Sequence, residues 1–252
     1  IERELGDALG LFMSLVPLLR ARVLPPAEFE VVRREAKELL DAHPEWPARH
    51  RVVFSGSLAM EYRRRGDFES AWRHQQDEAD EAERAGLHHL ADNARSNLAA
   101  TLVGLGRFDE ALRRVRELLQ RSGAAENPIG AHARVQQLNA LIGLDRLDEA
   151  EALSAEALAW CRRYDVLDIH QVMALLAARQ GRAAVAARYL GYHDACLRRR
   201  GAELPTDSHA PWREAQHLTE AVLGAATLTA LMDEGGRLDA TAADRLLFDS
   251  PA

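Results

Sequence analysis

Apolar side chains recur with helical spacing in the segment that follows Gly106. Counted from Phe108, they stand at positions i, i+3, i+4, i+7, i+10 and i+11, namely Phe108, Ala111, Leu112, Val115, Leu118 and Leu119. This spacing places them on one face of a helix. Segment 90–105 has an apolar side with the same period. The pattern therefore predicts two antiparallel helices joined at Gly106, because glycine adopts the positive φ of a tight turn without a steric penalty.

The same pattern occurs four times along the chain. Its copies begin at residues that we call the openers, Gly66, Gly106, Asp145 and Gly181, which lie 40, 39 and 36 residues apart. A period in this range is typical of stacked helical pairs. An alanine follows each opener by five residues, at Ala71, Ala111, Ala150 and Ala186. We expect these small side chains at helix crossings, where a larger residue would overpack the contact.

The segments on either side of the repeats are also predicted to be helical. Before them, "LGLFMSLVPLLR" and "PAEFEVVRREAKELL" form one further hairpin, with Pro26 in the first turn of its second helix. After a polar linker, we expect a helical segment broken near Gly224 and a short final helix capped by Asp239 or Thr241. The predicted parts are an N-terminal hairpin (1–49), the repeats (50–203) and C-terminal capping helices (204–252).

The residues around the openers resemble the tetratricopeptide repeat over roughly residues 50–200. The resemblance consists of a small residue, Tyr62 or Leu102, a glycine, Phe68 or Phe108, and an alanine, at matching offsets. The repeats are longer than the usual 34 residues, and the usual proline after the second helix is missing. The resemblance implies an all-α fold, an α-solenoid of tetratricopeptide-like hairpins with a C-terminal helical cap. It also implies a concave groove lined by the first helix of each hairpin.

A second resemblance covers roughly residues 181–249, from "GRAAVAARYLGYHDACLRRRGAELP" to "LGAATLTALMDEGGRLDATAADRLL". This stretch is similar to the C-terminal end of large bacterial signal-transduction ATPases that regulate transcription and carry a tetratricopeptide-like sensor. The resemblance implies that the chain is such a sensor arm, with ATPase and DNA-binding segments upstream. The chain has no phosphate-binding loop of the GxxxxGK[ST] type, and it begins with Ile1. We therefore expect it to be a piece of a longer protein.

The net charge and the cysteine content limit which binding partners and which cellular compartment we expect. The net charge is −7 and Lys37 is the only lysine, which argues against direct nucleic-acid binding, because that needs a basic face for phosphates. Two cysteines without metal-type spacing fit a reducing cytoplasm. No apolar run is long enough to span a bilayer. We expect a cytoplasmic protein without membrane contact, and self-association stays open.

The sequence predicts no catalytic residue, no metal site and no cofactor. Its ten histidines include no HExxH motif. No nucleophile–base arrangement can be argued from spacing, because such groups meet only in space. The acidic run 77–84, "DEADEAER", is interpreted as a solvated helix face, with a docking strip for a basic partner as the alternative. We therefore expect that the chain is not an enzyme.

The candidate binding site consists of polar residues on the first helices, predicted to face the groove: Arg63, Asn93, Ser96, Asn97, His132, Gln136, Asn139, Asp168 and Gln171. Amides and a histidine suit hydrogen bonding to a peptide backbone or to a small polar ligand, and the alternative is that they are surface amides without a ligand. The expected function is a non-catalytic protein- or ligand-binding module, the C-terminal sensor arm of a bacterial transcriptional regulator with an upstream ATPase domain. The alternative function is a free-standing tetratricopeptide scaffold or adaptor that joins other proteins.

Overall fold

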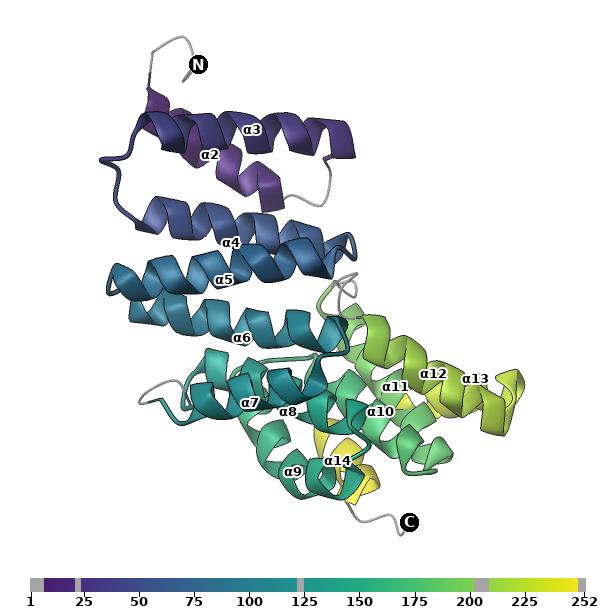
Figure 1. The fold of residues 1–252 in the computed structure, drawn as a ribbon. Coiled ribbons are helices and arrows are strands. Elements are labelled where there is room, and N and C mark those ends of the chain that lie inside the picture. Colours follow the sequence, from purple (N-terminus) through teal and green to yellow (C-terminus); the bar gives the residue numbers. More distant parts are fainter. Residues whose placement is uncertain (1–6, 21–23, 122–124, 202–208, 249–252) are drawn as a thin grey trace. The chain divides into compact units, whose positions relative to one another are not determined.

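The computed structural model describes residues 7–20, 24–121, 125–201 and 209–248. These residues form thirteen helices, α2 to α14, and contain no strand (Figure 1). The predicted all-α fold class is confirmed. Within the described part of the chain, no helix is both long enough and apolar enough to cross a bilayer.

The chain divides into two compact units, residues 1–105 and 106–252. Unit 1 contains α2 (Ala8–Arg20), α3 (Pro26–Ala42), α4 (Arg49–Arg64), α5 (Phe68–Arg84) and α6 (His88–Gly104). Unit 2 contains α7 (Phe108–Leu119), α8 (Pro128–Gly143), α9 (Leu147–Arg163), α10 (Ile169–Arg179), α11 (Ala183–Arg199), α12 (His209–Leu223), α13 (Ala225–Gly235) and α14 (Ala240–Phe248). The three-part division expected from the sequence stays a prediction.

Helices that follow one another along the chain pack against one another inside each unit. In unit 1, α2 packs on α3, α4 on α5, and α5 on α6. In unit 2, α7 packs on α8, α8 on α9, and α10 on α11, while α12 and α13 cover α11. Figure 1 shows α4, α5 and α6 as successive layers of one stack. This packing of each helix on its neighbours in sequence is the arrangement of an α-solenoid.

The openers end the first helix of each hairpin in a left-handed backbone conformation. Their φ angles are 80° at Gly66, 70° at Gly106, 58° at Asp145 and 79° at Gly181. At Gly66 the amide of the next residue, Asp67, donates to the carbonyl oxygen of Tyr62 at 2.9 Å, which is the hydrogen bond of a Schellman motif. Asp145 and Gly181 are followed by the same hydrogen bond. Aspartate fits this position because its short polar side chain tolerates a positive φ better than most residues.

The small and large residues around the openers pack as the repeat pattern predicts. The four alanines five residues after the openers, Ala71, Ala111, Ala150 and Ala186, are each 0% exposed. The ring of Phe68 lies against Gly104 at the end of α6, so that a β-carbon added to this glycine would overlap the ring. Phe108 lies against Gly143 in the same way, and a β-carbon there would stand 2.5 Å from Cε1 of the ring. Two successive repeats therefore use the same aromatic-on-glycine contact.

The two ends of the chain also match the predicted helices. Pro26 is the first residue of α3, and the first hairpin shares an apolar core with α4 that includes Phe12, Phe29 and Phe54. At the other end, Gly224 separates α12 from α13 with a φ of 77°. Of the two candidate caps of the last helix, Asp239 is the one used, because its Oδ1 accepts the amide of Ala242 at 2.8 Å. The centre of the predicted linker, 202–208, lies outside the described residues.

Candidate functional site

The nine predicted groove residues lie on first helices of hairpins or at their starts, but they are shared between the two units. Unit 1 holds Arg63 on α4 and three residues of α6, namely Asn93, Ser96 and Asn97. Unit 2 holds three residues of α8 and two at the start of α10, namely His132, Gln136, Asn139, Asp168 and Gln171. The nine residues thus form two groups, one in each unit. A common groove for all nine stays a prediction.

In unit 1 the group is only partly accessible. Arg63, Asn93 and Asn97 are half-buried. Ser96 is 4% exposed, so its side chain does not reach the surface. The backbone carbonyl of Asn97 accepts the hydroxyl of Thr101 at 3.3 Å, and Thr101 is fully buried against α5. This side of α6 therefore runs from a half-buried polar surface into the α5–α6 interface.

In unit 2 the residues of α8 form an accessible polar stripe, the α8 stripe, defined as His132, Gln136 and Asn139. They stand at i, i+4 and i+7, which is one face of a helix. His132 is exposed and the two amides are half-buried. Nδ2 of Asn139 donates to Oε1 of Gln136 at 3.4 Å, which aligns the two amides and leaves further donors and acceptors on each. The α8 stripe can therefore hydrogen-bond to a polar partner.

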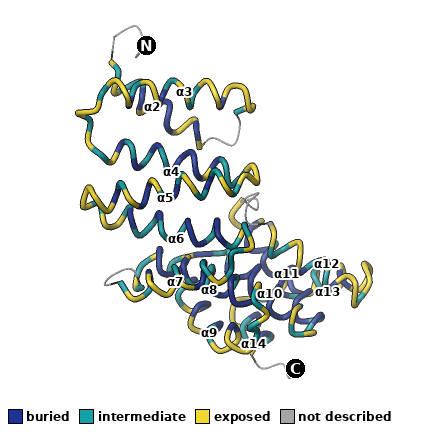
Figure 2. The backbone as a smooth tube through the Cα atoms, in the orientation of Figure 1, coloured by how far each residue is buried: buried dark blue, intermediate teal, exposed yellow. Residues whose placement is uncertain are grey.

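The two remaining residues of this group differ in exposure. Asp168 is half-buried at the N-cap position of α10. Gln171 is 1% exposed, and neither Nε2 nor Oε1 of its amide has a hydrogen-bond partner among the described residues. Gln171 is thus an interior residue and not part of a surface groove. The physical reason is that α10 lies in the middle of unit 2, packed against α8, α9, α11 and α12 (Figure 2).

A polar cluster between α10 and α11, which the sequence analysis missed, surrounds His170. The ring centroid of His170 lies 5.8 Å from Tyr189, 5.0 Å from Tyr192 and 5.9 Å from His193. All four side chains are buried. In the described part of the chain, the hydroxyl of Tyr189, Nδ1 of His170 and both ring nitrogens of His193 have no hydrogen-bond partner. Such atoms cost free energy in a folded protein, on the order of 1–3 kcal/mol each.

Burial keeps both histidines of this cluster uncharged. Burial, and then the neighbouring His193, lower the pKa of His170 to about 3. Burial also lowers the pKa of His193 to about 4. The pKa of the Tyr189 hydroxyl is raised by burial. The cluster is therefore a neutral polar interior at neutral pH.

One signal in the sequence could have located these interior residues. When the repeats are aligned on their openers, the residues ten before are Gly56, Ser96, Val135 and Gln171, and those twelve after are Glu78, Leu118, Ala157 and His193. All eight are buried. We call these two sets the interior columns. Two apolar members in the twelve-after column indicate that its other members, Glu78 and His193, also face the inside of their hairpins.

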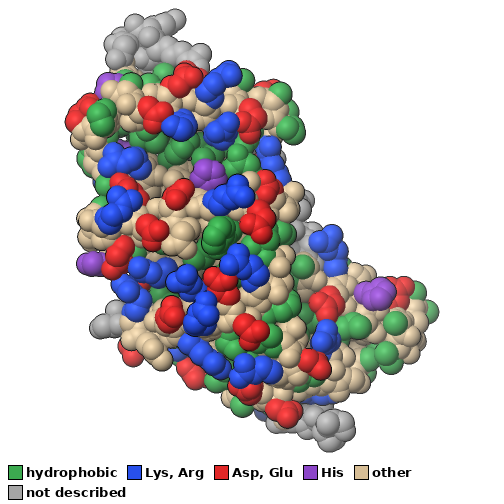
Figure 3. All heavy atoms as spheres, in the orientation of Figure 1, with side chains coloured by type: hydrophobic (Ala, Val, Ile, Leu, Met, Phe, Trp, Pro, Cys, Tyr) green, Lys and Arg blue, Asp and Glu red, His purple; other side chains and the backbone are tan. Residues whose placement is uncertain are grey.

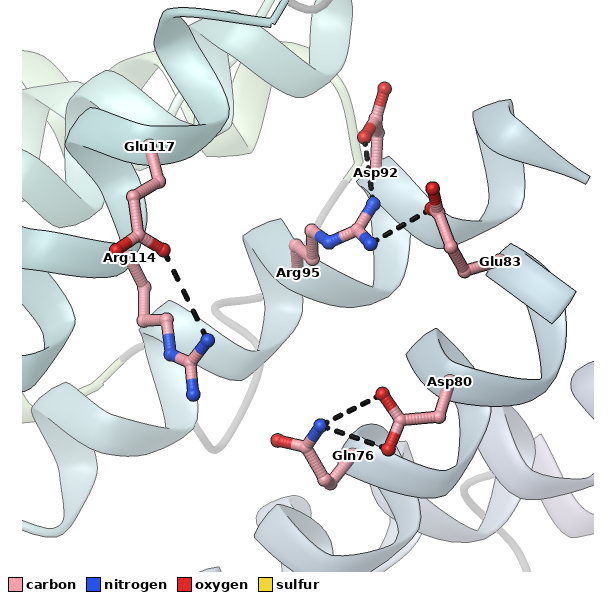
Figure 4. Close-up of polar contacts among 7 residues, drawn as sticks. All are labelled: Gln76, Asp80, Glu83, Asp92, Arg95, Arg114 and Glu117. Carbon is pink, nitrogen blue, oxygen red and sulfur yellow. Dashed lines mark hydrogen bonds and ion pairs between the residues drawn. The ribbon is translucent and has the colours of Figure 1, made fainter.

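Two carboxylates of the acidic run 77–84, Glu81 and Glu83, are paired with arginines inside unit 1. Oε1 of Glu81 accepts Nε of Arg51 at 3.0 Å. Figure 4 shows Arg95 extended between Asp92 of its own helix and Glu83 of α5, at 3.1 and 2.8 Å. Glu78, in the middle of the run, is buried, which corrects the interpretation of the whole run as a solvated face. The pattern misled because residues within one turn of a helix can face opposite environments, and here Asp77 and Asp80 are exposed whereas Glu78 between them is buried.

Figure 4 also shows two contacts between residues of the same helix, one on α5 and one on α7. Asp80 accepts Nε2 of Gln76 with both oxygens, at 3.0 and 3.1 Å. On α7, Nη1 of Arg114 lies 4.0 Å from Oε2 of Glu117. On the face that Figure 3 shows, acidic and basic side chains are interspersed. Asp80 is thus held by a neutral amide, whereas Glu117 is paired with a cation.

A shallow pocket in unit 2 lies where α9, α10 and α14 meet, beside Ser154, Met173 and Leu247. Its polar rim is used for structure. Nε2 of Gln180 donates to Oε2 of Glu151 at 2.9 Å. The guanidinium of Arg182 donates to the carbonyl oxygen of Leu247, at the end of α14. The pocket therefore lies at the packing interface of α14, which Arg182 helps to hold in place.

In the part of the chain that the structure describes, no three histidine, cysteine, aspartate or glutamate side chains are grouped so that they could hold a metal ion. Comparison with protein-family models and with curated protein sequences found no match for this chain.

Proposed function

We propose that this chain is a non-catalytic regulatory module that binds a protein segment or a small polar ligand through polar faces of the first helices of its hairpins. The observation that supports this most directly is the α8 stripe, His132, Gln136 and Asn139, which offers an exposed imidazole and two aligned amides on one helix face. Amide pairs of this kind match the alternating donors and acceptors of an extended peptide backbone.

We further propose that the module is the C-terminal sensor arm of a bacterial transcriptional regulator with an upstream ATPase domain, and that it works in the cytoplasm. The resemblance of residues 181–249 to the ends of such regulators supports this part. The helical hairpins support the binding part independently, because stacked hairpins expose long ordered faces on which polar side chains are held in fixed positions.

The binding part is tested with the purified chain and an array of random dodecamer peptides, followed by titration of the best binders. The double variant Gln136→Ala, Asn139→Ala should weaken binding about tenfold, because each lost hydrogen bond contributes roughly 0.5–1.5 kcal/mol. Gln120→Ala, which removes an exposed amide at the end of α7, is the matched control and should bind like the wild type. Binding that is absent, or equal in the double variant and the wild type, contradicts the proposal for this face.

The regulator part is tested on the source gene. A reading frame that continues upstream of Ile1 into a phosphate-binding loop and a DNA-binding or other output domain supports the sensor arm. A start codon within a few residues of Ile1 contradicts it. That second outcome favours the free-standing scaffold or adaptor, for which partner proteins would be identified by affinity purification.

A further inference from the structure

Glu78 is an ionisable residue at an interior position of its repeat. It is 5% exposed, in the column where the next two repeats carry Leu118 and Ala157. Its Oε1 lies against Gly56 of α4, where a β-carbon would stand only 2.5 Å away. In the described residues Oε2 has no hydrogen-bond partner. The carboxyl group therefore occupies the space that the glycine leaves at the α4–α5 crossing.

The helix that carries Glu78 also carries a buried amide one turn earlier. Oε1 of Gln75 accepts the hydroxyl of Thr101, on α6, at 2.6 Å, and Nε2 has no partner among the described residues. Residues three apart on a helix lie on neighbouring turns of one side. Through these two side chains, α5 contacts α4 with a carboxyl group and α6 with an amide. Movement of α5 away from α4 would also disturb its contact with α6.

The charges around Glu78 are engaged elsewhere. On α4, Arg51 is paired with Glu81, and Glu61 is paired with Arg64 and Arg65. On α6, Arg95 is paired with Glu83 and Asp92. Among the described residues, the charge that acts on the Glu78 carboxyl is Arg20, at the end of α2. Burial outweighs this attraction and raises the pKa of Glu78 to about 7.

We propose that the α4–α5 hairpin is a proton-operated switch, in which Glu78 is a neutral carboxylic acid while the hairpin is closed on Gly56. The step is a simple acid dissociation: the carboxyl O–H bond breaks, the proton passes to solvent, and a carboxylate remains. A carboxylate at this site is disfavoured relative to one in water, because burial outweighs the attraction of Arg20. Ionisation therefore favours opening of the crossing of α5 on α4, and the Gln75–Thr101 contact transmits the change to α6.

The test is to follow the Glu78 carboxyl carbon by NMR against pH, with its resonance assigned from its loss in Glu78→Gln. In parallel, amide hydrogen exchange of α4 and α5 is measured at pH 6 and pH 8 and corrected for intrinsic exchange. We expect a midpoint near pH 7 and about a tenfold rise in the opening equilibrium between these two pH values, from linkage between a closed-state pKa of about 7 and an ordinary glutamate when open.

Three variants separate the switch from a general effect of pH. Glu78→Gln should abolish the rise in opening. Glu78→Leu, which installs the residue of the next repeat, should do the same if the glutamine variant does not fold. Glu69→Gln, which removes an exposed carboxylate of the same helix, should retain the rise.

A carboxyl midpoint near the ordinary glutamate value overturns the proposal. So does an opening equilibrium that is equal at pH 6 and pH 8, or one that rises equally in the variants at Glu78. If neither of those variants is obtained, the hydrogen exchange of the wild-type chain at the two pH values still tests the proposal, because an equal opening equilibrium overturns it.

Discussion

Gly191 of α11 lies directly on the carbonyl group of Met232 in α13, so closely that a β-carbon on the glycine would overlap this carbonyl. One turn later on α13, Gly235 meets the carbonyl group of Arg188 in the same way. The two helices thus cross backbone to backbone. Because backbone atoms cannot rotate aside as a side chain can, this crossing requires glycine at both positions.

Gly191→Ala should therefore destabilise unit 2, by an overpacking cost on the order of 1–3 kcal/mol or more. The free energy of unfolding is measured by urea denaturation, and protection of α13 by hydrogen exchange. Gly236→Ala is the matched control, because a β-carbon there meets nothing closer than 3.6 Å and the φ is an ordinary −61°. If the two variants unfold at the same urea concentration, the close crossing of α11 and α13 is incorrect.

The aromatic-on-glycine contact of the repeats predicts energetic coupling between Phe68 and Gly104. Gly104→Ala should destabilise the wild type, because the new β-carbon overlaps the ring. The same change should be better tolerated in a Phe68→Leu background, where the smaller side chain leaves room. A double-mutant cycle on the free energy of unfolding measures the difference, and a coupling energy of about 0.5–3 kcal/mol is expected for contacting residues. Strictly additive effects would show that the ring does not lie on α6.

The buried histidines predict that unit 2 loses stability as the pH falls. Their folded-state pKa values are about 3 for His170 and about 4 for His193, below the ordinary value of 6.5. From pH 6.5 downward the unfolded chain therefore takes up protons that the folded chain does not. Stability should fall by about 1.4 kcal/mol per pH unit for each histidine until its folded-state pKa is reached.

Removal of one of these histidines should make that pH dependence shallower. His193→Leu installs the residue type found at the equivalent position Leu118, and should flatten the decline of the unfolding free energy between pH 6.5 and pH 4. His88→Gln, at an exposed histidine of unit 1, should leave the profile unchanged. A decline of equal slope in His193→Leu and the wild type would place His193 in water. The pH dependence at Glu78 has the opposite sign, so the two units should respond to opposite ends of the pH range.

Arg182 is expected to hold the last helix in place. Its guanidinium donates to the carbonyl oxygens of Leu246 and Leu247, which lack partners inside a helix that ends here. Arg182→Met should increase hydrogen exchange in segment 240–248 and leave that of α8 unchanged. Arg245→Met removes an exposed arginine from the same helix and serves as the control. Unchanged protection of segment 240–248 in Arg182→Met contradicts this role.

The helices and turns could be predicted from the sequence because they depend on local signals. The left-handed openers, the buried alanines after them, and Pro26 at the start of α3 follow from spacing within a few residues. The interior polar residues could not be predicted in this way, because the side of a first helix that faces its partner depends on tertiary packing. The expected geometry of the first helices predicts Ser96 and Gln171 in the groove, although both stand at the same repeat position as the buried residues Gly56 and Val135.

The cluster around His170 shows a second limit. Its four rings come from two helices whose crossing brings them within 6 Å, and no spacing along either helix encodes that crossing. The same holds for the interaction of Glu78 with Gly56. An acidic run on an exposed helix and a glycine inside another helix become informative only when the two are known to face each other.

The contacts of Phe68 with Gly104 and of Phe108 with Gly143 also bear on how such a chain can change its length during evolution. Each of the two stretches Gly66–Gly106 and Gly106–Asp145 contains one aromatic ring and the glycine on which that ring packs. A gene duplication of such a stretch would copy both halves of the joint together. The inserted copy would carry its own complete contact, so the array can gain or lose such a stretch without leaving a ring or a glycine unmatched.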